Sequence, residues 1–234
     1  MTDSAPSEGG LAPGLALIFD VDGVIVDSNP MHRESWTVFN RLYGLTTTDA
    51  MLQRMYGKRN DEIIRDYFGD SLPPEEIAAR SKAKEELYRK MIEGRIEQML
   101  VPGLRQFLDR YLGAPMAVAS NAEPENVSFI LDRAGLQPYF RAVVDGHQVS
   151  HPKPHPEIYQ RAASLLEVAP PNCIVFEDSH GGVAAARAAG MRVIGLRTTY
   201  VNLPGTDFAV DNFLSGPLTS WLGAQAPASE VTCG

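Results

Sequence analysis

The chain has 234 residues, and its 29 acidic and 21 basic side chains give a net charge of −8. This acid excess argues against nucleic acid or anionic membranes as partners, because clustered lysine and arginine bind those surfaces. Two cysteines provide no disulfide framework, and no apolar run reaches the roughly 20 residues of a membrane span. We therefore expect a cytoplasmic protein that binds neither nucleic acid nor membrane.

Composition predicts disordered tails around a folded core. Residues 1–14 and 223–234 contain almost no large apolar side chains, so neither end can bury enough surface to become ordered. Between them, five short apolar runs bounded by turn residues have the continuous apolarity of strands that are buried on both faces. The predicted strands are residues 15–19, 116–119, 142–144, 173–176 and 192–196.

Segments with helical periodicity separate the last four of these runs. They cover residues 124–134, 156–167 and 183–189, and Gly135 and Gly190 follow the first and the last of them, where helices commonly end. Strands and helices in alternation are typical of right-handed crossovers. We therefore predict an α/β core with a parallel sheet and helices on both faces.

The connection after the first predicted strand is much longer than one crossover helix requires. It contains three helical patterns, at residues 31–43, 60–68 and 74 to about 100. An inserted helical domain explains this connection most simply. We expect the core to consist of residues 15–29 and 101–222, and the inserted domain of residues 30–100.

Ligands of an open parallel sheet bind beyond the carboxyl ends of its strands, so the residues that follow each predicted strand are the candidates for chemistry. Asp20 and Asp22 follow the first strand and could share a divalent cation or divide nucleophilic and acid/base work. Such a pair is also common in turns. Ser120 and Asn121 follow the second strand and suit an anionic oxygen, but they equally suit a helix N-cap.

The loop after the third predicted strand contains Lys153 between two prolines. The prolines fix the backbone, so the ammonium group is either a phosphate counter-ion or an ordinary solvated lysine. The same loop holds His147, His151 and His155. Without Cys or Asp at ligand spacing these histidines give little indication of a metal site, and their role stays open.

Glu177 and Asp178 stand at the end of the fourth predicted strand. Adjacent acids there need a cation or hydrogen-bond donors, or they favour the N-terminus of the helix that follows. We expect these acids, the first two aspartates, the serine and the lysine to share one cleft. Oxygen ligands of this kind select a hard cation, and Mg²⁺ is the usual partner in phosphate chemistry.

Four short motifs carry a resemblance to a known family. They are Asp20-Val-Asp22-Gly-Val, Ser120-Asn121, Lys153-Pro-His-Pro-Glu and Glu177-Asp178-Ser179. In this order they resemble the motifs of the haloacid dehalogenase superfamily, in the branch with a helical cap after the first strand. That branch includes sugar-phosphate phosphatases and β-phosphoglucomutase. The resemblance covers residues 15–222 and implies a Rossmann-like core, an α-helical cap and Mg²⁺-dependent hydrolysis of a small, sugar-like phosphomonoester.

The resemblance also implies a role for each motif residue. Asp20 would be the nucleophile that forms an aspartyl-phosphate, and Asp22 would be the general acid and base. Mg²⁺ would bind the carboxylates of Asp20 and Asp178 and the backbone carbonyl of Asp22, with Glu177 in support. The expected contacts to the phosphoryl group are Ser120, Asn121, Lys153 and the backbone N–H groups of Val21 and Gly23.

The cap residues bear on the choice between a hydrolase and a hexose-phosphate mutase. In the mutase branch that the chain resembles, a cap histidine twelve residues after the nucleophile helps control the general acid and base. His32 takes that place, with Trp36 on the same helical face, and Lys84 also fits a substrate contact of the mutase branch. His32 and Trp36 could equally pack the cap. We carry all three as candidate substrate contacts.

One position argues against a mutase. The branch's mutases hold a second phosphate with an arginine that, counted from Gly57, corresponds to Asn60 in this chain. Lys58 and Arg59 stand just before it, and a small shift of the loop would let Arg59 reach the substrate. We therefore expect a phosphatase, with the mutase as the alternative.

Two further functions share this scaffold. A dehalogenase is built similarly, but halide displacement does not need the acid/base partner that Asp22 would supply. A metal-binding module without turnover would be expected to lack Asp20, Asp22 or Lys153, and all three are present. The sequence leaves the oligomeric state open, and a monomer is compatible with it.

Overall fold

The computed structural model describes residues 10–56 and 58–228. The chain divides into two compact units, of which one is formed by Met1–Asp27 with Met99–Gly234 and the other by Ser28–Gln98. The outer parts of both predicted tails, residues 1–9 and 229–234, lie outside the described residues. The second unit is thus inserted in the sequence of the first.

The first unit contains a parallel sheet, which within the described residues has six strands in the order β3-β2-β1-β4-β5-β6. The strands are β1 (Ala16–Phe19), β2 (Met116–Ala119), β3 (Ala142–Val144), β4 (Cys173–Glu177), β5 (Arg192–Leu196) and β6 (Phe208–Val210). The five predicted strands are confirmed, and β6 was not predicted. Strand order reverses beside β1, so the residues after β1 stand at the switch point where ligands bind in such sheets.

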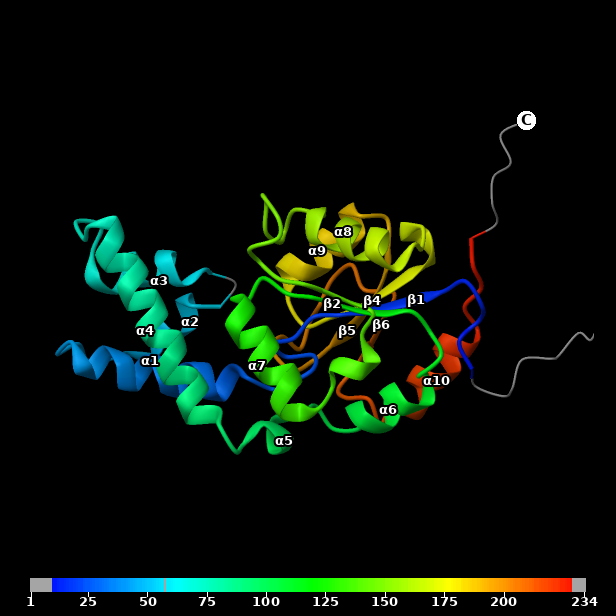
Figure 1. Cartoon of the computed structure of the whole chain (residues 1–234), viewed down its shortest axis with the longest axis horizontal. Coiled ribbons are helices and arrows are strands. Elements are labelled where there is room, and N and C mark those ends of the chain that lie inside the picture. Colours follow the sequence, from blue (N-terminus) through cyan, green and yellow to red (C-terminus); the bar gives the residue numbers. More distant parts are fainter. Residues whose placement is uncertain (1–9, 57, 229–234) are drawn as a thin grey trace, which may run out of the picture. The chain divides into compact units, whose positions relative to one another are not determined.

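Helices cover both faces of this sheet (Figure 1). The helices α8 and α9 lie on one face, where their apolar side chains pack on Ala16 and Ile18 of β1, and α6 and α10 lie on the other. On that second face, Phe19 stacks on Phe176 with 4.7 Å between ring centroids and meets Phe107 of α6 edge to face. The helices of this unit are α6 (Leu104–Arg110), α7 (Pro124–Ala134), α8 (Glu157–Leu166), α9 (His180–Ala188) and α10 (Gly216–Gly223). The predicted α/β class is therefore confirmed.

The ends of two helices follow directly from local sequence. Gly135 ends α7 in the left-handed conformation with a φ of 63°, as predicted. Ser179 caps the N-terminus of α9, because its Oγ accepts a hydrogen bond of 3.0 Å from Gly182 N. This cap starts α9 three residues earlier than the periodicity alone predicts and turns the N-terminus of the helix toward the end of β4.

The second unit is helical in its described part. Its helices are α1 (Asn29–Leu42), α2 (Asp49–Arg54), α3 (Asn60–Phe68), α4 (Pro74–Ile92) and α5 (Ile96–Met99), which ends one residue beyond the unit. Trp36, Phe39, Ile64 and Tyr67 belong to its apolar core. The prediction of one helix over residues 74–100 is wrong, because the chain turns at Gly94, where φ is +81°. Among the described residues no helix is both long and apolar enough to cross a membrane.

The segment after α10 is held against the core as far as the structure describes it. Arg192 Nη1 donates hydrogen bonds to Gln225 Oε1 at 3.0 Å and to Ala226 O at 3.2 Å. Ala228 N donates to Asn172 Oδ1 at 2.7 Å. Residues 224–228, which composition assigns to the C-terminal tail, therefore make specific polar contacts that a composition argument does not reveal.

Candidate active site

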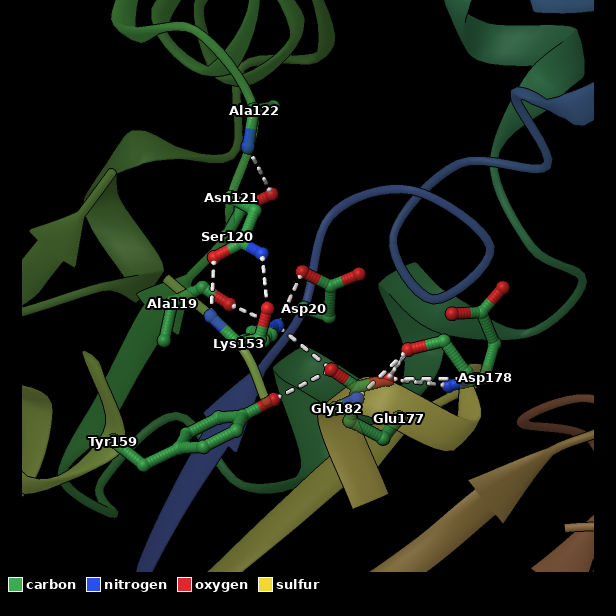
Figure 2. Close-up of polar contacts among 11 residues, drawn as sticks. Asp20, Ala119, Ser120, Asn121, Ala122, Lys153, Tyr159, Glu177, Asp178 and Gly182 are labelled. Atoms are coloured by element: carbon green, nitrogen blue, oxygen red, sulfur yellow. Dashed lines mark hydrogen bonds and ion pairs between the residues drawn. The ribbon is translucent and has the colours of Figure 1, made fainter. Parts of the chain in front are cut away.

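The carboxyl ends of the central strands bring the predicted site residues together, as Figure 2 shows. Asp20 directly follows β1, Ser120 directly follows β2, and Glu177 and Asp178 end and follow β4. Lys153 comes from the loop between β3 and α8. All five residues belong to the first unit, and the four from strand ends are buried.

Lys153 joins two of the carboxylates. Its Nζ donates to Asp20 Oδ1 at 2.8 Å, to Glu177 Oε1 at 2.7 Å and to the carbonyl oxygen of Ala119 at 2.9 Å, so all three of its donors are used. Only 6% of the side chain is exposed. Burial alone would lower the pKa of Lys153, but the charges of Asp20 and Glu177 outweigh it and raise this pKa. The lysine is therefore a fixed positive charge and not a solvated one.

Asn121 holds the backbone of this lysine in place. Its Oδ1 accepts a hydrogen bond from Lys153 N at 3.1 Å, and its Nδ2 donates to Lys153 O at 3.3 Å. Both ends of its amide therefore position the lysine, and the phosphate contact that the sequence suggested for Asn121 stays a prediction. Ser120 lies beside it with 2% exposure, and its Oγ accepts a hydrogen bond from Ala122 N at 3.2 Å.

Glu177 is completely buried and bonded through both carboxylate oxygens. Its Oε1 accepts hydrogen bonds from Lys153 and from the hydroxyl of Tyr159, the latter at 2.7 Å (Figure 2). Its Oε2 accepts from Asp178 N, Ser179 N and Ser179 Oγ at 3.0 to 3.1 Å. Burial would raise the pKa of Glu177, but Lys153 and the other donors lower it below its ordinary value. Glu177 is thus an ionised anchor for the lysine and for the start of α9.

The other two carboxylates are less well compensated. Burial raises the pKa of Asp20 to about 7, with the negative charges of Glu177 and Asp22 adding to the effect and Lys153 opposing it. Burial, with the charges of Glu177 and Asp20, also raises the pKa of Asp178 well above its ordinary value. Thr199 Oγ1 donates a hydrogen bond to Asp178 Oδ2. These two groups therefore hold protons more readily than ordinary aspartates, in the absence of further positive charge.

A tight turn follows Asp20. Asp22 is half-buried there, and its charge contributes to the raised pKa of both Asp20 and Asp178, so it lies near the same cluster. Val21 is buried, and its carbonyl accepts hydrogen bonds from the end of the turn. Gly23 N donates to Val26 O at 2.7 Å, so this N–H closes the turn. The phosphate contact that the sequence suggested for this N–H stays a prediction.

Gly23 instead permits a close approach to Asp178. Its φ is +77°, a conformation that side chains disfavour, and a Cβ at this position would lie 1.8 Å from Asp178 Oδ2. Its carbonyl oxygen accepts a hydrogen bond of 2.6 Å from Thr198 Oγ1. The glycine therefore brings the turn after β1 against the carboxylate that follows β4.

The structure also supports a cation between these acids. Asp20, Glu177 and Asp178 place carboxylate oxygens within 4.8 Å of one another. If all three of these buried carboxylates are ionised, they exceed the one ammonium of Lys153 by two negative charges. Buried charge without compensation is costly, and hard oxygen ligands suit Mg²⁺. The donor set thus fits a divalent hard cation.

Three predicted substrate contacts of the inserted domain lie together within the second unit. Lys84 Nζ is 3.0 Å from His32 Nδ1 and 5.1 Å from the ring centroid of Trp36. It also donates to Glu85 Oε1 at 2.8 Å. Burial would raise the pKa of Glu85, but Lys84 and His32 lower it to about 2. Sequence reasoning missed Glu85, which supplies the counter-charge of this cluster.

Two basic side chains of the loop before α3 form ion pairs with neighbouring acidic side chains of the same unit. Lys58 Nζ lies 3.5 Å from Asp66 Oδ2, and Arg59 Nε lies 3.7 Å from Asp61 Oδ1. Asn60 donates a hydrogen bond of 2.6 Å to Glu85. Gly57, from which the expected arginine position is counted, lies outside the described residues. Asn60 therefore contacts the lysine–histidine cluster, whereas Arg59 is exposed on this loop.

Sequence reasoning missed two further groups of the site. Tyr159 points its hydroxyl at Glu177 from the first turns of α8, and nothing in a helical pattern marks such a long-range contact. Thr198 and Thr199 follow β5 closely, so the strand-end rule that selected Ser120 would also have selected them. They were overlooked because a threonine pair has no distinctive chemistry by itself.

Comparisons with known proteins agree with this geometry. The family described as haloacid dehalogenase-like hydrolase matches residues 15–190. A fructose-1-phosphate phosphatase, YqaB of Escherichia coli, is 35% identical over 77% of this chain and 95% of its own length. A β-phosphoglucomutase of Bacillus subtilis is 28% identical over 77% of this chain and 82% of its own.

A solved structure extends the similarity to the fold. The crystal structure of β-phosphoglucomutase from Clostridium difficile matches with a TM-score of 0.77 and 25% identity, over 89% of this chain and 96% of that one. The match spans both the sheet and the inserted helices in sequence. Sequence and fold therefore lead to the same group of proteins.

Proposed function

The chain belongs to the haloacid dehalogenase-like hydrolases, and on this premise we propose that it is a Mg²⁺-dependent phosphatase of a small, sugar-like phosphomonoester. The observation that carries the proposal is the contact of Lys153 with Asp20 and Glu177 inside a cluster of buried carboxylates. A carboxylate can attack a phosphoryl dianion only where positive charge offsets their repulsion. With Asp20 as the nucleophile, this cluster would combine a buried attacking group with such charge.

Asp20, Asp178 and the backbone carbonyl of Asp22 would hold the cation. Support comes from the oxygen donor set and from the excess of two negative charges described above. Glu177 would support the cation site indirectly, since its two carboxylate oxygens already accept hydrogen bonds from five donor groups. When bound, Mg²⁺ would offset the charge of the phosphoryl group and favour the ionised form of Asp20.

The reaction would proceed in two displacements at phosphorus. A carboxylate oxygen of Asp20 forms a bond to phosphorus as the bond to the sugar oxygen breaks, which gives an aspartyl-phosphate. Asp22 donates a proton to the departing sugar oxygen. Asp22 then accepts a proton from a water molecule that attacks phosphorus, and inorganic phosphate leaves as Asp20 is restored.

Lys153 and Ser120 would bind the transferring group. The lysine is held by Asn121 and its ammonium group is charged, so it is already oriented when substrate arrives. The hydroxyl of Ser120 is buried beside it, at the end of the neighbouring strand. Such preorganised donors stabilise the charge that develops on phosphoryl oxygens.

A hexose-phosphate mutase is the second candidate. The contact between Lys84 and His32, and the similarity to β-phosphoglucomutases, favour it. Asn60 argues for the phosphatase, since it binds Glu85 at the place where the resemblance would require an arginine for a second phosphate. The 35% identity to a fructose-1-phosphate phosphatase points in the same direction.

The products distinguish the two candidates. The purified enzyme with Mg²⁺ would be given a panel of sugar phosphates that includes fructose 1-phosphate, and inorganic phosphate would be measured. A parallel reaction would contain β-glucose 1-phosphate with a trace of the 1,6-bisphosphate. Release of free phosphate supports the phosphatase, whereas glucose 6-phosphate without free phosphate would establish the mutase.

We also place this activity in the cytoplasm. The small number of cysteines and the free, buried thiol of Cys173 support a reducing compartment. Cell fractionation with an antibody to the chain would test the assignment, and recovery from an extracytoplasmic fraction would overturn it.

A further inference from the structure

Three ligand-bearing side chains gather beside the loop that carries Lys153. His151 and His155 stand two residues before and two residues after the lysine, and Glu157 is the first residue of α8. His151 Nδ1 lies 3.0 Å from Glu157 Oε2, and His155 Nδ1 lies 3.9 Å from the same oxygen. The centroids of the two imidazole rings are 4.6 Å apart. The chain therefore brings two imidazoles and a carboxylate to one place.

Glu157 is the ligand that the sequence did not reveal. Its carboxylate turns back over the loop, where Oε1 accepts a hydrogen bond from Ser150 N at 2.8 Å and Oε2 accepts one from His151 N at 3.1 Å. These bonds fix the carboxylate against the backbone next to His151. The histidine-rich loop thus acquires an oxygen ligand whose orientation is set before any ion binds.

The spacing agrees with one tetrahedral ion. Zn–N and Zn–O bonds of about 2.0 to 2.1 Å at tetrahedral angles put neighbouring ligand atoms about 3.3 Å apart. The measured separations of 3.0 and 3.9 Å lie on either side of this value. One ligand atom from each residue falls within 4.8 Å of the other two. His155 Nδ1 accepts a hydrogen bond of 3.3 Å from Glu157 N, so its ring would have to turn to bind the ion through this atom.

We propose that His151, His155 and Glu157 form a second metal site, which binds Zn²⁺. Imidazole nitrogen selects zinc and its neighbours in the transition series over Mg²⁺, whereas the cluster around Asp20 offers oxygen alone. The side chains of His151 and His155 are 67% and 50% exposed, so the ion has a path of entry and water can fill its fourth position. The two sites therefore take different ions from the same solution.

The ion would join the two sides of the turn that presents Lys153. In the conformation that brings the three ligands together, the lysine contacts both Asp20 and Glu177. An ion that binds this conformation and not an unfolded loop stabilises it by mass action. Zinc would thus favour the arrangement in which the lysine is in place.

Calorimetric titration of Zn²⁺ into the full, untagged chain tests the proposal, with excess Mg²⁺ present to fill the oxygen cluster. The wild type is expected to bind one zinc ion. His151→Gln and His155→Gln should each weaken this binding by at least about tenfold, since even outer groups around a metal change affinity by about 10- to 100-fold. Binding is measured without substrate, so this test and the test of phosphatase activity fail independently.

His147→Gln is the matched control. His147 belongs to the same loop and is exposed, but its Nε2 pairs with Glu123 Oε2 at 2.7 Å, away from the three proposed ligands. Its variant should bind zinc like the wild type, and its thermal midpoint should rise with zinc in the same way. Absence of zinc binding by the wild type, or equal binding by His155→Gln and His147→Gln, would overturn the proposal.

Discussion

Lys153 Nζ lies 2.8 Å from Asp20 Oδ1, although 133 positions separate the two residues in the sequence. The contact connects the loop after β3 with the end of the central strand, in the interior of the first unit. Because the lysine also binds Glu177, it is the positive centre of an otherwise acidic site.

Replacement of Lys153 by alanine should reduce kcat/KM for phosphate release by at least about 100-fold, because a preorganised cation that faces the developing charge is lost. Loss of the ammonium would also raise the pKa of Asp20 further, since Lys153 is the group that lowers it. Lys90→Ala, an exposed position on α4, is the control and should retain activity. Circular dichroism would confirm that both variants fold, and a folded Lys153→Ala enzyme with normal activity would refute the assignment.

The raised pKa of Asp20 predicts how Mg²⁺ affects stability. Burial raises this pKa from 3.8 to about 7, so the folded carboxyl keeps a proton over a pH range in which the unfolded chain has released it. Without a cation, stability therefore decreases as pH rises through this range. Bound Mg²⁺ favours the ionised carboxylate and should reverse the loss.

Thermal unfolding in EDTA and in Mg²⁺ measures this effect. The increase in Tm on addition of Mg²⁺ should be larger at about pH 8 than at about pH 5, conditions on either side of the raised pKa. A similar increase at both values would mean that cation binding is not linked to these carboxylates.

Gly23→Ala should abolish Mg²⁺-dependent activity, because the new Cβ would lie 1.8 Å from Asp178 Oδ2 and the φ of +77° disfavours any side chain. Gly44→Ala is the matched control, since Gly44 has a φ of +73° but nothing within 4 Å of the added atom. In urea unfolding, the free energy of unfolding of the control should decrease by only about 1 to 2 kcal/mol, the cost of a side chain in this conformation. If both variants had the same Mg²⁺-dependent activity and the same free energy of unfolding, the contact with Asp178 would be unimportant.

Tyr159→Phe should reduce the free energy of unfolding by about 1.5 to 3 kcal/mol, because a buried hydroxyl that donates to the charged Glu177 is removed. Tyr43→Phe removes a hydroxyl from a side chain that is 46% exposed, and it should change stability by less than about 0.5 kcal/mol. Urea denaturation of both variants measures these free energies of unfolding. Equal decreases for the buried and the exposed substitution would contradict the prediction.

Much of the core could be predicted because its strands are buried on both faces. The run Ala16–Phe19 is completely buried, and a continuous apolar run of that length between turn residues is typical of a strand in the interior of a sheet. The sequence did not predict β6 (Phe208–Val210), of whose three residues only Val210 is fully buried. The helical periodicity likewise does not reveal the break at Gly94, where the positive φ of one residue separates α4 from α5.

The site residues likewise include some that the sequence could group and some that it could not. Asp20, Ser120 and Asp178 could be grouped from the sequence because parallel strands bring their carboxyl ends to one edge. Tyr159 and Glu157 could not, since their contributions depend on which way a helix face or a carboxylate turns in three dimensions. The use of Asn121 to hold Lys153 likewise depends on two backbone bonds that no residue pattern records.

The most direct measurement of the central claim is release of inorganic phosphate by the wild type and by Asp20→Asn, each with and without Mg²⁺. Asparagine has nearly the same shape as aspartate but lacks the nucleophilic charge, so the fold should persist while the reaction stops. We expect the wild type to release phosphate only when Mg²⁺ is present, and Asp20→Asn to release none under either condition. Turnover by a folded Asp20→Asn enzyme at the wild-type rate would contradict it.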